Sequence, residues 1–214
     1  ETTGPNPWLA EVVGISFCLN PGTAYYVPIP ENSLDAKKII LEFKEVFSNK
    51  HISKIGQNLK FDISVLKKYN ISVCGKLFDT MIAHYIIRPD MRHNMDLLAA
   101  TYLNYNTITY DSIIEKKAGK SISIRDVEIN KLTEYACEDA DITYQLKNTF
   151  LEMLEKQEVR DVFEKMEMPL IDVLSNMEKE GIALDSEHLL RLSKDLEKDI
   201  SLLEGEIHLL SGTS

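Results

Sequence analysis

The feature that most constrains the fold of this chain is a run of apolar and small residues at helical spacing. Its members recur at steps of three and four: Leu132, Ala136, Ala140, Thr143, Leu146, Phe150 and Leu154. This spacing is typical of an amphipathic helix that buries one stripe and leaves the rest of its surface in water. A helix of this length crosses much of a small domain. We therefore expect the other elements to pack around it.

Tyr135 and Asp139 lie four residues apart on this predicted helix. Positions i and i+4 project from one side of a helix, so the phenol hydroxyl and the carboxylate can face a common point beside the buried stripe. One interpretation is the rim of a cleft in which the two groups act together. The other is a solvated acidic face with an interfacial tyrosine, and the stretch alone leaves both open. Glu138 and Asp141 we interpret as structural or solvated.

Composition narrows the class of protein. The chain has 214 residues, enough for one domain with an appendage or for two small domains. Three cysteines form no CxxC pair, which indicates a reducing compartment such as the cytoplasm and argues against structural zinc. The histidines show no metal-ligand spacing, so His93 receives no role. No apolar run approaches about 18 residues, and the start resembles no signal peptide, so we expect no membrane partner.

The net charge of -10 argues against a protein that binds nucleic acid through a broad basic face. It leaves room for a narrow site, because carboxylates that bind divalent cations make a chain acidic and the cations attract phosphate.

Shorter patterns predict an α/β chain: a mixed β-sheet flanked by helices, followed by a C-terminal helical hairpin. The expected elements, in chain order, are strands at 11–18 and 24–29 forming an antiparallel hairpin, a helix at 35–47 with Ser33 as N-cap, a strand at 51–55, a helix at 60–69, a strand at 77–78, a helix capped by Asp79 and ending near 87, a helix at 94–103, and, beyond the long helix, helices at 159–180 and 186–210. Pro169 predicts a kink or restart. Gly181 is the expected C-cap before the hairpin loop, and Asp185 or Ser186 the expected N-cap after it.

Three acidic residues from separate segments could meet where strands end: Glu1, Asp62 and Asp139. A cluster that offers only oxygen suits magnesium or manganese. Two such ions about 3.5–4 Å apart can activate water and stabilise a leaving oxygen, an arrangement that nucleases use.

The residues that carry these groups resemble a known family. The segments Glu-Thr-Thr-Gly at 1–4, Ile-Gly-Gln-Asn-Leu-Lys-Phe-Asp at 55–62 and Tyr-Ala-Cys-Glu-Asp-Ala-Asp at 135–141 are similar to the three exonuclease motifs of the 3′-5′ proofreading domain of family A DNA polymerases, in the subclass with Tyr four residues before the last Asp. Residues 77–81, 92–96 and 107–110 also match. Residues 166–170 and 180–185 resemble the segment that leads into the polymerase domain.

The resemblance implies a ribonuclease H-like exonuclease fold over residues 1–156, with residues 157–214 as the helical lead-in to the polymerase domain. It implies hydrolysis of the terminal phosphodiester at a single-stranded or frayed DNA 3′ end, in the bacterial cytoplasm. The implied partners are DNA and a polymerase domain that follows this chain. The implied cofactors are two divalent cations, magnesium or manganese, with zinc as a further candidate.

Carried over by position, Glu1, Asp62 and Asp139 would be the metal ligands. Tyr135 would orient the attacking water as the fourth catalytic residue. The residues that match substrate-contacting positions are Thr2, Gln57, Asn58, Lys60, Arg92 and Tyr110. Four of the carried-over residues have simpler interpretations. Asn58 could cap a helix, and Asp62 could favour its dipole. Arg92 and Tyr110 could have plain surface or packing roles.

The chain departs from the family at its first motif, which is Asp-x-Glu at the end of a central strand. Here the sequence begins at the Glu, so the strand and its Asp are absent. We expect residues before Glu1 in the parent protein, and poor metal binding and little hydrolysis without them. A free amino group at Glu1 would also place a positive charge where a cation belongs. The alternative is a catalytically silent module of the same fold that binds DNA or braces the polymerase domain.

Overall fold

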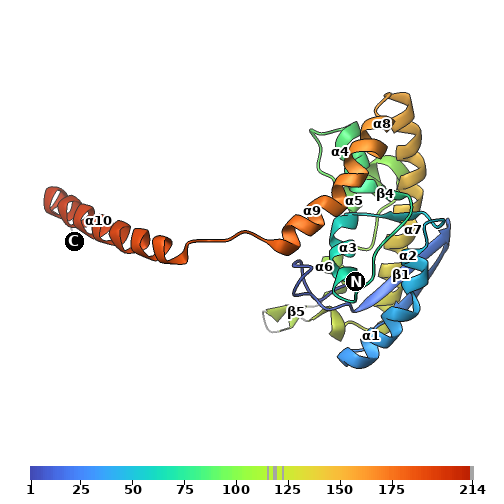
Figure 1. Ribbon diagram of the computed structural model, residues 1–214, viewed down its shortest axis with the longest axis horizontal. Helices are drawn as coiled ribbons and strands as arrows, with labels where there is room; N and C mark the ends of the chain where they lie inside the picture. Colours follow the sequence, from blue (N-terminus) through green and yellow to red (C-terminus); the bar gives the residue numbers. More distant parts are fainter. Residues whose placement is uncertain (115, 118–119, 122, 213–214) are drawn as a thin grey trace. The chain divides into compact units, whose positions relative to one another are not determined.

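The fold is built on one long helix, against which strands β1, β2 and β3 and shorter helices pack (Figure 1). The computed structural model describes residues 1–114, 116–117, 120–121 and 123–212. The elements are β1 (Gly14–Asn20), β2 (Thr23–Pro28), α1 (Ser33–Glu42), α2 (Lys44–Ser48), β3 (Lys54–Gly56), α3 (Leu59–Lys67), β4 (Leu77–Asp79), α4 (Thr80–Ile87), α5 (Met95–Leu98), η1 (Ala99–Leu103), α6 (Tyr110–Ile113), β5 (Lys116–Lys117), β6 (Lys120–Ser121), η2 (Ile124–Asp126), α7 (Ile129–Lys156), α8 (Arg160–Val162), η3 (Phe163–Glu167), α9 (Met168–Glu180) and α10 (Ser186–Ser211).

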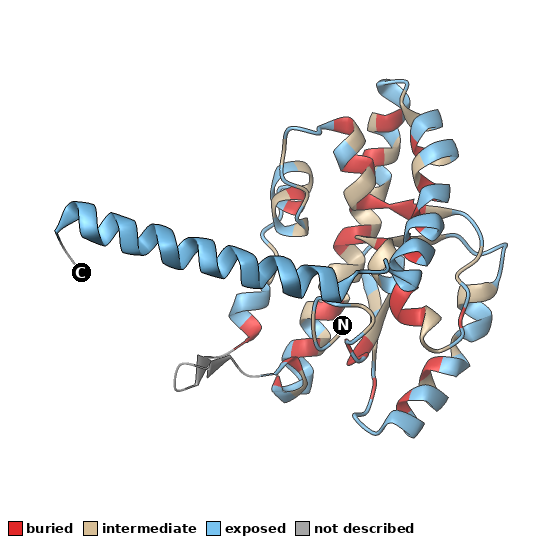
Figure 2. Ribbon diagram, turned by 60° about the vertical axis from the view of Figure 1, so that its left-hand side comes forward, coloured by how far each residue is buried: buried red, intermediate tan, exposed pale blue. Residues whose placement is uncertain are grey.

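Helix α7 is the predicted long helix, and its apolar stripe is buried as expected. Of the stripe, Leu146, Phe150 and Leu154 have no exposed surface. The helix packs against both strands of the first pair, against β3 and against α4. Figure 2 shows its buried stripe facing the rest of the unit, with exposed positions on the opposite side. The prediction that the chain is organised around this helix is confirmed.

The described strands form three separate pairs, β1–β2, β3–β4 and the short β5–β6, instead of one continuous sheet. β1 runs antiparallel to β2, from Gly14 opposite Pro28 to Asn20 opposite Thr23, so the predicted hairpin is confirmed. β3 runs parallel to β4, from Lys54 opposite Leu77. Among the strands that the structure describes, β1 and β3 each pair on one side only. The mixed character of the sheet is as predicted, but its middle is open.

The first residues of the chain extend the β1 side of this opening. Thr2 bridges Val12 in antiparallel fashion, and the Val13 amide donates to the Glu1 carbonyl at 2.8 Å. The Glu1 amino group donates to the Gly14 carbonyl at 2.8 Å. This short ladder therefore reaches the point where β1 begins.

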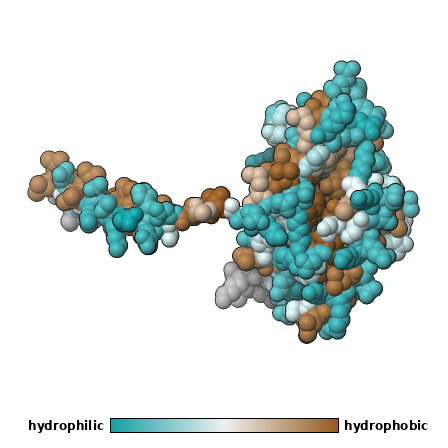
Figure 3. Space-filling model, in the orientation of Figure 1, coloured by the Kyte–Doolittle hydropathy of each residue, from teal (hydrophilic) through white to brown (hydrophobic). Residues whose placement is uncertain are grey.

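A cavity of about 650 Å³ lies between the β1–β2 pair and the β3–β4 pair. Ile15 and Phe17 of β1 and Ile55 of β3 line it, together with side chains of α3 and α7. Figure 3 shows hydrophobic residues at the centre of this face between hydrophilic margins. The opening in the sheet is thus an apolar recess with acidic residues in its wall.

Residues 1–179 form one compact unit and residues 180–214 a second. Helix α9 belongs to the first unit, where Met168 and Ile171 are buried in the same core as α7. The restart predicted at Pro169 is present as a π-helical turn, η3, directly before α9. Proline lacks an amide hydrogen, so the regular helical bond cannot form there.

The second unit is a single long helix, α10. Its N-cap is Asp185, whose carboxylate accepts from the His188 amide at 2.9 Å, as predicted. None of its side chains is buried (Figure 2). Gly181, the other expected cap, has a φ of +69°, the left-handed conformation that ends helices. The pairing of α9 with α10 as a hairpin stays a prediction.

Some local expectations were wrong. The N-cap of α1 is Asn32, whose side chain accepts from Leu34 and Asp35, and Ser33 is already helical. The helix expected at 35–47 is divided at Phe43 into α1 and α2.

Among the described residues, no helix is long and apolar enough to cross a membrane. All three cysteines are free.

Candidate functional site

The bend before α3 positions Asp62, and a buried carboxylate on β4 fixes that bend. Asp79, with no exposed surface, accepts from the amides of Asn58 at 3.2 Å and Leu59 at 2.6 Å. It also caps α4, as predicted, through two further amides. One side chain thus satisfies the N-termini of two helices. Asn58 occupies the N-cap position of α3, as its simpler interpretation predicts, but its side chain makes no capping hydrogen bond.

Asn58 adopts a left-handed backbone with φ of +65°. Asparagine tolerates this conformation better than most residues, which explains its presence at the turn. Its neighbour Gln57 is held at both ends of its amide, donating to the His93 carbonyl at 2.8 Å and accepting from the Thr80 hydroxyl. The bend is therefore fixed before any ligand arrives.

Tyr135 and Asp139 interact on α7, as the spacing predicts. The Tyr135 hydroxyl and the Asp139 carboxylate are within hydrogen-bonding reach, and both side chains are half-buried. Burial, followed by the charge of Glu1, raises the pKa of Asp139 to about 7. Burial and the charges of Asp139 and Glu1 raise the pKa of Tyr135 above its usual value, so its phenol stays protonated.

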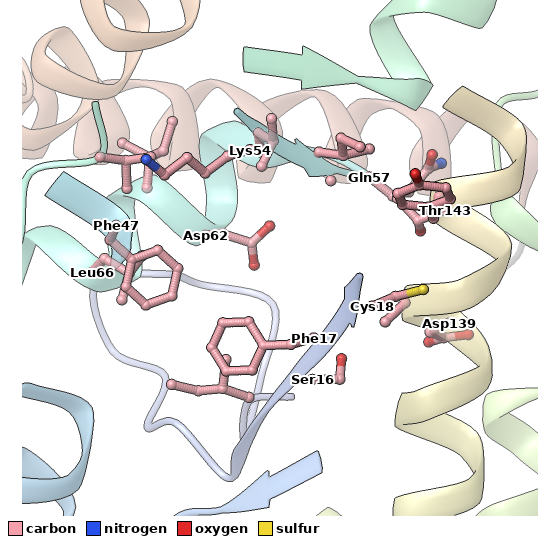
Figure 4. A pocket seen from close by; sticks show the side chains of 18 of the residues that line it. Ser16, Phe17, Cys18, Phe47, Lys54, Gln57, Asp62, Leu66, Asp139 and Thr143 are labelled. Carbon is pink, nitrogen blue, oxygen red and sulfur yellow. The ribbon is translucent and has the colours of Figure 1, made fainter. Parts of the chain in front are cut away.

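Asp62 faces the cavity from α3, where it remains accessible to cavity water (Figure 4). Enclosure by the cavity walls raises the pKa of Asp62 to about 7. The Glu1 ammonium opposes this effect, whereas the carboxylates of Asp79 and Glu1 add to it.

The structure brings part of the predicted site together. The predicted residues that line the cavity are Glu1, Thr2, Gln57, Asp62 and Asp139. Glu1 raises the pKa of both aspartates, so the three acids share one electrostatic environment. Within the described ranges, however, no three acidic, cysteine or histidine side chains converge closely enough to hold a metal ion.

The other predicted residues lie outside the cavity lining. Lys60 forms an ion pair with Glu178 of α9. Arg92 and Tyr110 are exposed, and neither side chain has a polar partner in the part of the chain that the structure describes. Their charged and aromatic groups are therefore available to a ligand.

Two carboxylates beside the pair on α7 serve the fold, as interpreted from the sequence. Glu138 accepts from the Tyr105 hydroxyl at 2.7 Å and the Ile108 amide at 2.6 Å. Asp141 accepts from the Gly22 amide at 2.7 Å, which ties the hairpin turn to α7.

Sequence reasoning missed one cluster next to the Gln57 bend. His84 of α4 contacts His93 through their Nδ1 atoms at 2.7 Å and Tyr102 at 2.9 Å through Nε2. A separation of nine residues across a loop has no periodicity that would reveal this contact. The only available signal was the presence of two histidines on either side of Pro89.

Comparison with known proteins agrees with this geometry. The 3′-5′ exonuclease family model matches residues 1–155. DNA polymerase I of Borreliella burgdorferi is 35% identical over 211 residues, which are 97% of this chain and 23% of that protein. DNA polymerase I of Pseudomonas aeruginosa is 34% identical over 99% of this chain and 24% of its own length. The chain thus spans about a quarter of the length of these relatives.

Among solved structures, Brucella melitensis NrnC with bound Mg²⁺ superposes with a TM-score of 0.65 at 21% identity, covering 85% of this chain and 83% of that one. This likeness concerns the fold, and the predicted ribonuclease H-like α/β class is confirmed. The match over residues 1–155, together with these relatives, means that the chain belongs to the 3′-5′ exonuclease family of A-type DNA polymerases.

Proposed function

We propose that this chain contributes the 3′-5′ exonuclease site of a DNA polymerase I, which removes the terminal nucleotide from a DNA 3′ end during proofreading. The observation that carries the proposal is the shared environment of Glu1, Asp62 and Asp139. Asp62 and Asp139 line one cavity from different helices, and Glu1 raises the pKa of both. A bound cation would relieve the repulsion by which Glu1 raises these pKa values.

The donor chemistry of the cavity fits two divalent cations of the magnesium type. Its acidic groups offer only carboxylate oxygens, and water reaches Asp62. Glu1, Asp62 and Asp139 would hold the ions. When bound, the ions would lower the pKa of a water and stabilise the departing 3′ oxygen. A solved structure of similar fold, that of Brucella melitensis NrnC, contains bound Mg²⁺.

Tyr135 would act on the attacking water through its hydroxyl. Burial keeps this phenol protonated, so it can donate one hydrogen bond and accept another. Asp139 is within its reach and fixes its orientation. The proposed role of Tyr135 is therefore to orient the water. A tyrosinate that takes a proton from the water would need a lowered tyrosine pKa, whereas this site raises the pKa of Tyr135.

The terminal nucleotide would lie over the cavity, with its strand passing toward the exposed Arg92 and Tyr110. Arg92 suits a phosphate, and Tyr110 suits a base face, a contact that any base sequence satisfies. Asn58, Lys60, Thr2 and Gln57 would border the strand near the bend. A narrow basic and aromatic track of this kind is compatible with the overall charge of -10.

The parent protein would carry a polymerase domain after this chain and act on DNA in the bacterial cytoplasm. Support comes from the relatives, which are DNA polymerases I and are about four times longer than the matched region. The gap between β1 and β3 would be filled by a strand that precedes Glu1, because the ladder at residues 1–3 points there.

The test uses the full-length protein and a single strand labelled at its 3′ terminal nucleotide, with magnesium or manganese. We expect stepwise release of the label, and a loss of about 10²-fold or more for Asp139→Asn and Tyr135→Phe. The control is Asp141→Asn, which removes a neighbouring carboxylate that ties the hairpin turn to α7. Equal activity of the parent and Asp139→Asn would contradict the exonuclease proposal.

The second candidate is a silent module that binds DNA without cutting it. The absence of three converging ligands in the described ranges favours it. The same assay decides between the two. A silent module would bind the labelled strand with the same affinity in the parent and in Asp139→Asn, and it would release no nucleotide at any metal concentration.

A further inference from the structure

The loop between α4 and α5, residues 88–94, is joined to the bend before α3 through His93. His93 meets the rest of the protein through both its ring and its backbone: its Nδ1 lies 2.7 Å from His84 Nδ1, and its carbonyl accepts from the Gln57 side chain at 2.8 Å. Its ring also meets Tyr85 edge-on, with ring centroids 5.4 Å apart. The loop and the bend before α3 therefore join at His93.

His84, on the other side of this contact, is a rigid anchor. It has no exposed surface, and its Nε2 is bound to the Tyr102 hydroxyl at 2.9 Å. Phe150 of α7 packs against both rings, with centroids 5.5 Å from His84 and 5.1 Å from Tyr102. Both ring nitrogens of His84 are thus committed, and its orientation is set by the core.

The two Nδ1 atoms need one proton between them, with one nitrogen donating and the other accepting. Burial, with the neighbouring His93 and Arg88 adding, lowers the pKa of His84 to about 4, so this ring is neutral near pH 7. A neutral imidazole can satisfy both partners at once, because it has one donor and one acceptor. The bond from α4 to the loop is therefore complete without water.

Arg92 precedes His93 and is exposed, without an ion pair among the described residues. Its guanidinium is placed only by the backbone of its own loop. Whatever fixes that backbone decides where the guanidinium can meet a phosphate. The strongest fixed points are the two bonds of His93.

We infer that His84 and His93 are positioning residues for the DNA strand: their Nδ1 contact and the His93–Gln57 bond lock the Arg92 loop to the bend that carries Asn58 and Asp62. The inference rests on the proposed exonuclease function and adds to it a part of the strand-binding surface. Neither histidine touches the reacting atoms. We expect the lock to act on KM for the DNA strand more than on kcat, because it aligns a phosphate contact remote from the cleaved bond.

The test compares two substitutions of His93 in the full-length protein. The amide of asparagine lies where Nδ1 of histidine lies, whereas the amide of glutamine lies near Nε2, so His93→Asn can keep the bond to His84 and His93→Gln cannot. We expect His93→Gln to raise KM for a single-stranded oligonucleotide by about 2–10-fold, the value of one lost hydrogen bond. His93→Asn should stay within about 2-fold of the parent. Equal KM values for the two variants would overturn the inference.

A second comparison separates the lock from simple stabilisation. In an Arg92→Ala background, His93→Gln should leave KM unchanged, because the group that the lock positions is gone. A lower melting temperature with an unchanged KM in the parent background would show a structural role only and overturn the inference. If Arg92→Ala itself leaves KM unchanged, the strand path in the proposed function fails. If Arg92→Ala raises KM and His93→Gln does not, the lock alone fails.

Discussion

At the scale of single residues, the site depends on a carboxylate that meets no substrate. Asp79 accepts hydrogen bonds from four backbone amides at the starts of α3 and α4. Burial raises the pKa of this carboxyl group, and the four hydrogen bonds oppose that rise. We expect Asp79→Ala to lower the unfolding free energy by about 1–4 kcal/mol, since each lost N-cap costs about 0.5–2 kcal/mol. Urea unfolding measures this value. Asp90→Ala, at an exposed position, is the control and should change it by less than about 0.5 kcal/mol.

The raised pKa of Asp139 in the cavity should make the free energy of unfolding fall as pH rises. The pKa of Asp139 is raised to about 7 in the folded chain, above the unfolded value of 3.8, so the folded state binds its proton more tightly. Stability from this group is therefore complete below pH 3.8 and is lost as pH rises through 7. Without metal, the melting temperature of the 214-residue chain should be higher for Asp139→Asn than for the parent at pH 8, and the difference should disappear near pH 4. A parent more stable than the variant at pH 8 without metal would contradict the shift.

At the scale of elements, α3 has two faces with different partners. One face directs Asp62 into the cavity, and the other meets α9 through polar contacts: Ser64 with Ser175 at 2.9 Å, Lys67 with Asp172 at 2.8 Å, and Lys60 with Glu178. Helix α9 is thus fixed along the helix that carries a proposed metal ligand.

The Lys60–Glu178 pair should compete with DNA for the same ammonium. Both side chains are partly exposed, and such pairs contribute at most about 1 kcal/mol. We expect Glu178→Gln to tighten binding of a single-stranded oligonucleotide by up to about 5-fold at low salt. Glu180→Gln removes the same charge two residues away and serves as the matched control. If both substitutions tighten binding equally, the effect is general electrostatics and the pair plays no part.

Helices with one buried stripe could be predicted from the sequence because their packing partner does not alter their period. The stripe of α7 and the cap of α4 at Asp79 were both predictable on this ground. The division of the sheet was not, because the pairing of short strands such as β3 depends on neighbours distant in sequence. The break at Phe43 likewise interrupts a pattern that reads as one helix.

The candidate site was predictable where it follows helical spacing and not where it depends on loops. Tyr135 and Asp139 interact because four residues separate them on one helix. The His84–His93 contact joins a helix to a loop, so no spacing indicates it. The position of Lys60 in the sequence predicts a contact with the DNA strand. Its ion pair with Glu178 of α9 depends on packing that only the structure shows.

At the scale of the whole molecule, the first unit extends beyond the boundary suggested by the motifs. Phe163, Met168 and Ile171 are buried in the core that α7 forms with α4. A chain ending at residue 156 would lose these side chains, each stabilising the fold by about 1.5–3 kcal/mol. A chain ending at 179 keeps them. We expect the 1–179 chain to unfold in one transition near the midpoint of the parent, and the 1–156 chain to be largely unfolded at 25 °C by circular dichroism. Equal midpoints for the two truncations would contradict this assignment of α9.

The middle of the sheet is open. Among the strands of the described ranges, β1 and β3 each have an unpaired edge toward the cavity, and the ladder at Glu1 ends where β1 begins. Residues added before Glu1 would continue along β1 at about 3.3 Å per residue, so about six of them would follow its seven residues.

We expect an extension of alternating threonine and valine at this point to raise the unfolding free energy by about 1–3 kcal/mol, since new backbone hydrogen bonds and buried valines outweigh the cost of ordering the strand. The control is an extension of the same length with proline in place of each valine, because proline cannot donate to a ladder. Urea unfolding of the two chains measures the difference. Equal stabilities would mean that the cavity does not accept a strand, and the acids around it would then have to bind metal without the support of a closed sheet.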